Sequence, residues 1–150
     1  LLAALGSQML KVAGTLADGT ITWMTGPDTI ASHTVPTITA AAEAAGRDEP
    51  PRVVVSAPVC VTDDPDGARD RAGSALAMYG LLPSYRAMLD REGASGPADL
   101  TIVGTLEQVR EQVGRYVEAG ATEFIALNFS EAPEEYEATR AALRALAAAG

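Results

Sequence analysis

Apolar and polar positions along the chain follow two different periods, and their order predicts strands separated by helices. Short apolar runs occupy residues 1–5, 20–24, 53–61 and 124–129, and three of the four are rich in β-branched or aromatic residues. The first run does not alternate, which is typical of a strand buried on both faces. Between the runs, apolar residues recur at helical spacing. The chain is therefore predicted to be an α/β protein with about four parallel strands and flanking helices.

Two helices are expected in the first third of the chain. After the Gly6-Ser7 turn, the first helix should bury one apolar face, made of Met9, Val12, Ala13, Leu16 and Ala17. The second should run from a cap at Asp28 to Gly46 and either kink or start a new turn at Pro36, because proline lacks the amide hydrogen of a regular helix. His33 has no Cys, Asp or Glu at metal-ligand spacing, so it is expected on the solvent face.

Local signals mark element ends further along. Pro58 cannot donate to a sheet, so it should mark a bulge or a change of strand pairing. Asp63-Asp64-Pro65-Asp66 resembles a metal cluster, but Asp64 as helix cap and Pro65 as first helical residue explain it better. Thr105 and Gln108 have the spacing of a capping box, and a terminal helix is expected over residues 131–149.

Composition narrows the function classes. The 150 residues, 47% hydrophobic, are expected to form a single domain over residues 1–150. The net charge of −9 argues against a nucleic-acid surface, because phosphate contacts need clustered Lys and Arg. Cys60, the only cysteine, permits no intramolecular disulfide, fits a cytoplasmic location, and is expected as a small buried hydrophobe. No apolar run approaches the ~18 residues of a membrane span, and no secretory signal is evident.

The best candidate for a binding site is the turn after the first strand. A strand, a helix and a parallel strand form a βαβ unit, which binds ligands at the carboxyl ends of its strands. The helix amides that follow Gly6 have no intrahelical partner and carry the positive end of the helix dipole. Gly6 allows close approach and Ser7 offers a hydroxyl, which suits an anion. An ordinary turn with a helix cap would look the same.

Several segments in a fixed order resemble a known family. Ala4-Leu5-Gly6, Ala13-Gly14 and Ala17-Asp18-Gly19 followed by a strand resemble the luciferase-like monooxygenase superfamily, in its branch that uses the deazaflavin coenzyme F420. The stretches VCVTDDPDGARDRA, LPSYRAMLDREG and VGTLEQVREQVGRYVEAGATEF resemble it too. The resemblance implies the C-terminal half of a (β/α)8 TIM barrel rather than a small doubly wound sheet, with the N-terminal half absent from this chain and activity of the chain alone not expected.

The resemblance also implies a function and a site. The complete barrel would be an F420-dependent oxidoreductase, with the backbone of Ala4, Leu5, Gly6 and Ser7 holding the coenzyme phosphate and Thr25 and Gly26 bordering it. Tyr79 and Tyr85 are candidate substrate-pocket residues, although ordinary packing would also explain them. Some family members carry a lysine after the second turn, where this chain has Pro27 and Asp28, which argues against a strongly anionic substrate there.

Other interpretations stay open. FMN in place of F420 would use a similar fold and phosphate site. An ordinary sugar-phosphate barrel half would place its anion near Asn128 and Ser130. A non-catalytic fragment that self-associates is the alternative from another class. Half a barrel exposes two sheet edges, which favour pairing with another chain, so this chain is expected to form a homodimer.

Overall fold

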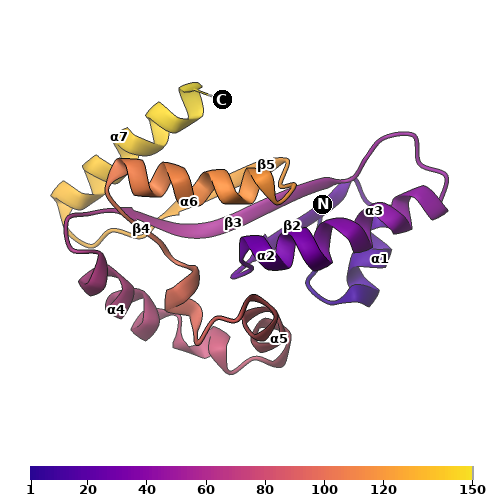
Figure 1. Ribbon diagram of the computed structural model, residues 1–150, viewed down its shortest axis with the longest axis horizontal. Helices are drawn as coiled ribbons and strands as arrows, with labels where there is room; N and C mark the ends of the chain where they lie inside the picture. Colours follow the sequence, from indigo (N-terminus) through magenta and orange to yellow (C-terminus); the bar gives the residue numbers. More distant parts are fainter. Residues whose placement is uncertain (150) are drawn as a thin grey trace.

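The computed structural model describes residues 1–149 and contains a five-stranded parallel sheet (Figure 1). Its strands are β1 (Leu2–Ala3), β2 (Gly19–Trp23), β3 (Arg52–Val61), β4 (Ile102–Gly104) and β5 (Glu123–Asn128). Both β2 and β5 pair with residues 54–56 of β3, so they lie on its opposite edges. β4 pairs only with residues 59–61, beyond the end of β2. The α/β class and the four predicted strands are confirmed, and β4 is an additional short strand.

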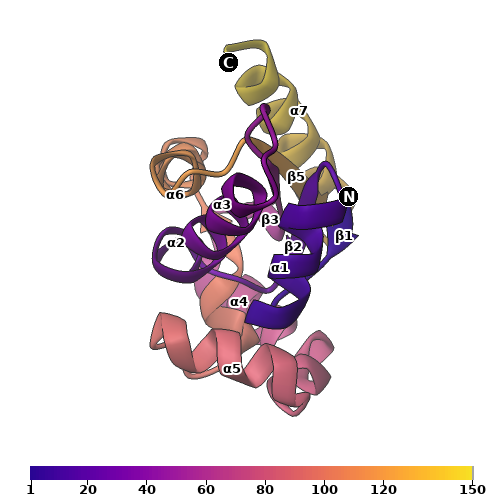
Figure 2. The same ribbon diagram turned by 90° about the vertical axis from the view of Figure 1, so that its right-hand side faces the viewer.

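Helices and helical turns connect the strands. They are α1 (Ser7–Leu16), α2 (Pro27–Thr29), the π-helical η1 (Ile30–Thr34), α3 (Val35–Ala44), α4 (Pro65–Ala75), the 3₁₀ turn η2 (Ala77–Gly80), α5 (Pro83–Glu92), the 3₁₀ turn η3 (Pro97–Leu100), α6 (Leu106–Glu118) and α7 (Pro133–Ala149). In Figure 2, α3 and α6 lie on the same side of β2 and β3. None of the helices within residues 1–149 is long and apolar enough to cross a membrane.

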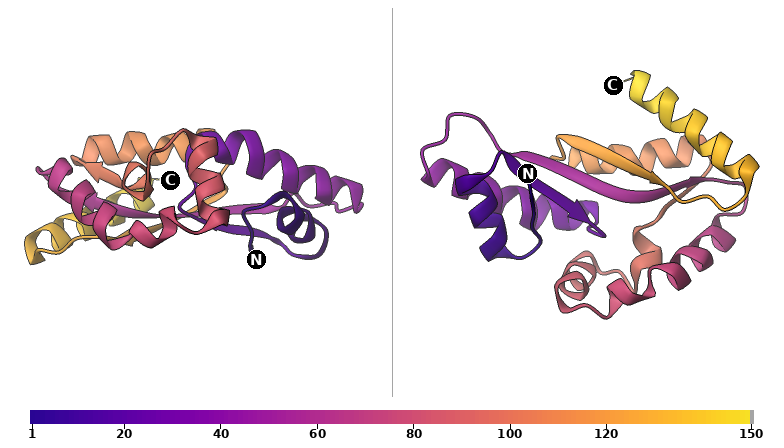
Figure 3. Two further views of the ribbon diagram at one scale, coloured as in Figure 1. Left: turned by 90° about the horizontal axis from the view of Figure 1, so that it is seen from below. Right: turned by 180° about the vertical axis from the view of Figure 1, so that it is seen from behind.

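The two faces of the sheet are covered unequally. On one face Val53, Val55 and Val59 of β3 pack against α1, α3 and α6, with Leu143 and Leu146 of α7 at the margin. The strand register places Ile21, Trp23, Ser56, Ile125 and Leu127 on the other face. There Ile125 and Leu127 are 47% and 49% exposed. Viewed from behind, β2, β3 and β5 lie in front of α6 (Figure 3, right).

β1 and α1 differ from their predictions. β1 has two residues instead of five and is not buried on both faces, because it pairs only with β2 and its outer face lacks a covering helix. The buried face of α1 is Leu10, Ala13 and Gly14, whereas Leu16 is 79% exposed. The cause is close packing on α3, where a Cβ on Gly14 would lie 2.9 Å from the Cβ of Ala41. Contact between helices, rather than the size of the apolar side chains, decides the orientation of α1.

Pro36 lies at the start of a new helical turn, the second of the two predicted outcomes, and a π-helical turn precedes it. The Val35 amide donates to the carbonyl of Ile30, five residues back, and Pro36 then lies in the first turn of α3. This wider turn accommodates a proline, whose ring clashes with the preceding turn of a regular α-helix. The extra residue also rotates the helix surface, so that His33 faces the interior and is 7% exposed. The prediction that His33 lies on the solvent face is wrong.

The predictions for β3 hold. Pairing with β2 ends opposite Ser56 and pairing with β4 begins at Val59, so Pro58 lies where the neighbour on that edge changes. Cys60 is fully buried and packs with Ala68 and Val103, as a small hydrophobe would.

The predicted helix caps at Asp64 and Thr105 are confirmed, whereas the cap predicted at Asp28 is wrong, because Gly26 is the N-cap residue and Asp28 lies within α2. The Gly67 amide donates to Asp64 Oδ1 at 3.0 Å at the start of α4. At the start of α6, the Gln108 amide donates to Thr105 Oγ1 at 3.3 Å, and the Thr105 amide donates to Gln108 Oε1 at 2.9 Å. The acidic stretch before α4 therefore acts as a helix start. Within residues 1–149, no group of three or more His, Cys, Asp or Glu side chains could hold a metal ion.

Candidate functional site

The turn between β1 and α1 presents an uncapped helix start. Gly6 is the N-cap residue, and no side chain caps the helix. The Leu10 amide makes the first intrahelical hydrogen bond, to the Gly6 carbonyl at 3.0 Å, so the amides of residues 7–9 precede that ladder. The first turn carries no acidic side chain. This end of α1 therefore keeps the positive potential of its dipole.

The backbone does not itself require glycine at residue 6. Gly6 has φ −77° and ψ 153°, an extended conformation that any residue adopts. A Cβ built there would meet no heavy atom within 4 Å. The missing side chain therefore relieves no contact inside the chain and leaves open space over the helix start.

That space adjoins a mostly apolar cavity of about 480 Å³ at the carboxyl ends of β1 and β2. Its walls come from the segment from β1 to α1 and from β2, β3 and α5. They include Ala4, Leu5, Gly6, Met9, Ile21, Trp23, Ser56, Ser84 and Tyr85. The cavity brings together the turn at Gly6 and one of the two candidate substrate residues, Tyr85. The role of each in binding stays a prediction.

Three aromatic side chains form one side of this region. The Trp23 and Tyr79 ring centroids lie 6.1 Å apart, and those of Tyr79 and Tyr85 lie 4.9 Å apart, both edge to face. Tyr79 therefore contacts two residues of the cavity wall, Trp23 and Tyr85. Burial raises the pKa of the Tyr85 hydroxyl. Trp23 was not identified from the sequence as a candidate site residue. The signal was available, because Trp23 is the single tryptophan of the sequence and lies near the end of a predicted strand.

His33 contacts the turn between β1 and α1 through the backbone of Leu5. Its Nε2 lies 2.9 Å from the carbonyl of Leu5, one residue before Gly6. A carbonyl can only accept, so Nε2 carries a hydrogen and donates it to this carbonyl. This contact fixes the end of β1 against η1. Ile30 lies three residues before His33 and is also buried. Residues three apart share one face of a helix, so the apolar Ile30 was the signal in the sequence that His33 faces the interior.

The second predicted turn is arranged differently. Thr25 is buried and its hydroxyl donates to the Trp23 carbonyl at 3.2 Å, while Gly26 is the N-cap of α2. The amides of Asp28 and Thr29 donate to the carboxylate of Glu92, at 3.2 and 2.7 Å. Gly26 thus borders a carboxylate of the chain itself, and the role of Thr25 and Gly26 in cofactor binding stays a prediction. Nothing in the sequence connects Glu92 with this turn.

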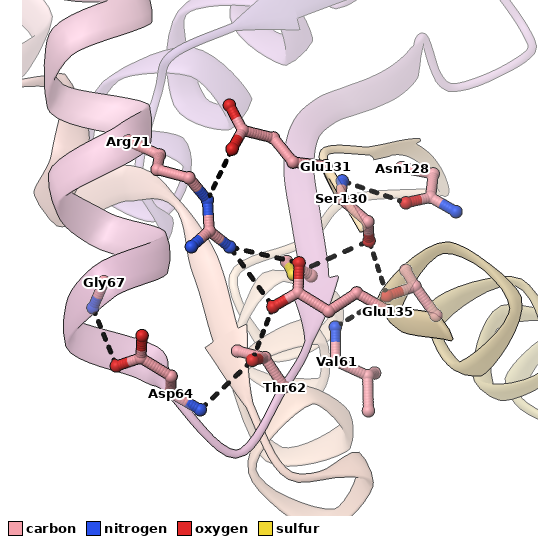
Figure 4. Close-up of polar contacts among 11 residues, drawn as sticks. Val61, Thr62, Asp64, Gly67, Arg71, Asn128, Ser130, Glu131 and Glu135 are labelled. Atoms are coloured by element: carbon pink, nitrogen blue, oxygen red, sulfur yellow. Dashed lines mark hydrogen bonds and ion pairs between the residues drawn. The ribbon is translucent and has the colours of Figure 1, made fainter. Parts of the chain in front are cut away.

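At the alternative anion site, the polar groups bind one another (Figure 4). The Ser130 amide donates to Asn128 Oδ1 at 3.2 Å, and Asn128 Nδ2 donates to the Tyr136 carbonyl at 3.1 Å. Nearby, Glu135 accepts hydrogen bonds from Thr62 at 2.8 Å and from Arg71 at 3.1 Å. Arg71 is thereby neutralised by an internal carboxylate. This arrangement disfavours a phosphate near Asn128 and Ser130.

Comparison with known proteins identifies the family. The sequence profile of the luciferase-like monooxygenases matches residues 1–123, a stretch that includes both turns and the whole cavity wall. The chain belongs to the luciferase-like monooxygenase family. No curated protein sequence matches it.

Solved structures similar to this family member include enzymes with different cofactors. An F420-dependent secondary alcohol dehydrogenase superimposes with a TM-score of 0.69 at 21% identity, over 96% of this chain and 47% of that one. The F420-dependent tetrahydromethanopterin reductase of Methanopyrus kandleri gives 0.69 at 21%, over 91% and 46%. The FMN-bound oxygenating constituent of 3,6-diketocamphane monooxygenase of Pseudomonas putida gives 0.64 at 16%, over 92% and 44%. The chain spans about half the length of these proteins, which accounts for its half-barrel sheet.

Proposed function

We propose that this chain supplies the cofactor-phosphate side of an F420-dependent oxidoreductase. The observation that carries the proposal is the open glycine turn at Gly6, where an uncapped helix start meets an apolar cavity. Backbone amides at such a turn bind phosphate without any basic side chain, which suits a chain of net charge −9. Membership of the family and the likeness to two F420-dependent enzymes support the same assignment.

The residues around the Gly6 turn have different roles in this proposal. The backbone of Ala4, Leu5, Gly6 and Ser7 binds the phosphate, with the Ser7 hydroxyl as a further donor. His33 holds the Leu5 carbonyl and so fixes the direction of the following amides. The bound deazaflavin would supply hydride transfer to or from an organic substrate.

The cavity wall would orient the organic part of the ligands. Trp23 and Tyr85 give it flat apolar surfaces that exclude water from the space beside the turn. Tyr79 keeps both rings in place through its edge-to-face contacts. We assign Tyr85 to direct contact with the substrate and Tyr79 to its support.

FMN is the alternative cofactor, because the structural likeness extends to an FMN-bound monooxygenase. Its phosphate would use the same turn. Titration of the natural polypeptide that contains this chain with F420 and, separately, with FMN distinguishes the two. Tighter binding of FMN than of F420 would replace the deazaflavin assignment with a flavin-dependent monooxygenase.

The test of the phosphate site is the Gly6→Val variant. A branched side chain would fill the open space over the helix start and displace the phosphate, yet it meets nothing in the chain, so the fold should persist. Loss of one charge-assisted hydrogen bond of about 1.5–3 kcal/mol should raise the dissociation constant roughly tenfold or more. Cofactor fluorescence measures it.

A matched control is Gly96→Val, at a second extended glycine with no heavy atom within 4 Å of its built Cβ. This variant should bind the cofactor as tightly as the wild type. Equal affinities of Gly6→Val and Gly96→Val would remove the phosphate from the β1–α1 turn.

A further inference from the structure

Two turns of the same kind, each with a glycine before a helix, follow β1 and β2. At Gly6 the space where a side chain would stand is open, whereas at Gly26 a Cβ would overlap the carboxyl group of Glu92. Gly26 has φ −83° and ψ 170°, so its backbone does not require glycine. What requires glycine there is the close approach of a carboxylate from α5.

The Glu92 carboxylate is held as an anionic ligand would be. It accepts hydrogen bonds from the amides of Asp28 and Thr29, at 3.2 and 2.7 Å, at the start of the continuous helical run α2–η1–α3. Amide donors bound to an ionised carboxylate form stronger hydrogen bonds than those between neutral groups. A second tie, from the Thr29 hydroxyl to the Met88 carbonyl at 3.4 Å, fixes α5 against the same turn.

The other side of Glu92 faces solvent through a polar cavity of about 350 Å³, lined also by Pro27, Asp28, Arg115 and Tyr116. An Arg115 nitrogen lies 3.9 Å from Asp28 Oδ1, so the cavity wall also carries a cation. A small anion could therefore reach this turn if its amides were free.

We propose that Glu92 is a specificity-determining residue that keeps anionic ligand groups out of the turn after β2. Its carboxylate occupies the amides that a phosphate or carboxylate would use, and its charge repels a second anion. The inference rests on the proposed function in assigning cofactor phosphate to the Gly6-Ser7 turn. Anion binding is confined to that turn, and the part of the ligand that reaches the end of β2 is uncharged.

The experiment is a titration with inorganic phosphate, followed by the amide NMR signals of Ser7 and Thr29 in the full chain. In the wild type, phosphate should shift the Ser7 signal and leave Thr29 unchanged. In Glu92→Ala, the Thr29 signal should also shift, and it should saturate at a phosphate concentration at least about tenfold below the highest one that leaves the wild-type signal unchanged. Glu118→Ala is the control, because it removes one exposed negative charge elsewhere.

The outcomes separate this inference from the proposed function. A Thr29 signal that responds to phosphate equally in the wild type and Glu92→Ala, or in neither, overturns the role of Glu92. A Ser7 signal that never responds contradicts the phosphate site at Gly6 but leaves the Glu92 comparison intact. If Glu92→Ala does not fold, the wild-type chain still decides, because a phosphate-dependent shift at Thr29 would contradict exclusion.

Discussion

Several polar side chains of this protein tie together elements that are distant in sequence. His33 binds the end of β1. The fully buried Thr139 of α7 accepts a hydrogen bond from the Val61 amide at 2.8 Å. Glu135 lies between Thr62 at the end of β3 and Arg71 of α4. Leaving such a buried partner unpaired costs about 1–3 kcal/mol, so these contacts are as important to the fold as single core side chains.

Glu135→Gln should lower the free energy of unfolding by about 1 kcal/mol near neutral pH. The hydrogen bond from Thr62, together with the charge of Arg71, lowers the pKa of the Glu135 carboxyl. Because the folded-state pKa is lowered, this stabilisation is present above the unfolded-state pKa of about 4.3 and is lost as pH falls through the folded-state value. Urea denaturation of both proteins across this pH range measures it. A difference that persists unchanged in strong acid would contradict the assignment.

Residues of the candidate site were predictable only where their chemistry follows from position along the chain. Gly6, Ser7 and Tyr85 are identified by a strand end, a helix start or the family resemblance, and all lie at or near the cavity. His33 and Glu92 act through partners 28 and 63–64 residues away. A contact at such a distance leaves no periodic signal, so only the folded chain shows it.

At the scale of elements, the side-chain caps of α4 and α6 were predictable, whereas the start of α2 and the orientation of the helices were not. The caps at Asp64 and Thr105 join residues three positions apart, so the sequence contains the whole interaction. The orientation of α1 depends instead on α3, and that of His33 on a π-helical turn before Pro36. Apolar periodicity could not predict either, because exposed Leu16 is as apolar as buried Leu10.

Gly14→Leu should destabilise the protein by about 1–3 kcal/mol or more, through overpacking of α1 on α3. A Cβ on Gly14 would contact Ala41 at 2.9 Å and the backbone of Ala42 at 3.2 Å, and backbone cannot move aside cheaply. The matched control is Gly114→Ala in α6, where nothing lies within 4 Å of a built Cβ. That change should stabilise by about 0.5–1 kcal/mol, because glycine is a poor helix former. Urea denaturation midpoints test both, and an unchanged midpoint for Gly14→Leu would contradict the close approach.

For the molecule as a whole, the uneven covering of the sheet matters most. Within residues 1–149, β1 pairs only with β2, and β5 pairs with β3 alone, so the outer edges of both strands are unpaired. Between these edges, the face of the sheet that carries Ile125 and Leu127 is the one opposite α1, α3 and α6, and these two apolar side chains are about half exposed. Exposed strand edges and apolar patches of this kind favour association with another chain.

We therefore expect the chain in isolation to form a dimer at tens of micromolar. A two-fold axis along the direction of the strands would bring β5 of one copy beside β1 of the other, in the parallel sense, at both seams. Four barrel strands from each copy would then close one sheet, and the faces that carry Ile125 and Leu127 would meet inside it. Light scattering measures the mass of the assembly.

Added salt should strengthen this dimer, because each copy carries a net charge of −9 and screening weakens the repulsion between them. Replacing Ile125 and Leu127 together with Asp should shift the chain to monomer, since both side chains are about half exposed and would be buried in the assembly. Replacing exposed Val117 of α6 with Asp is the control, because α6 packs on the covered face of the sheet, and this change should leave the dimer intact. A monomeric wild-type chain at tens of micromolar, or a dimer that survives the double substitution, would contradict association through the open face.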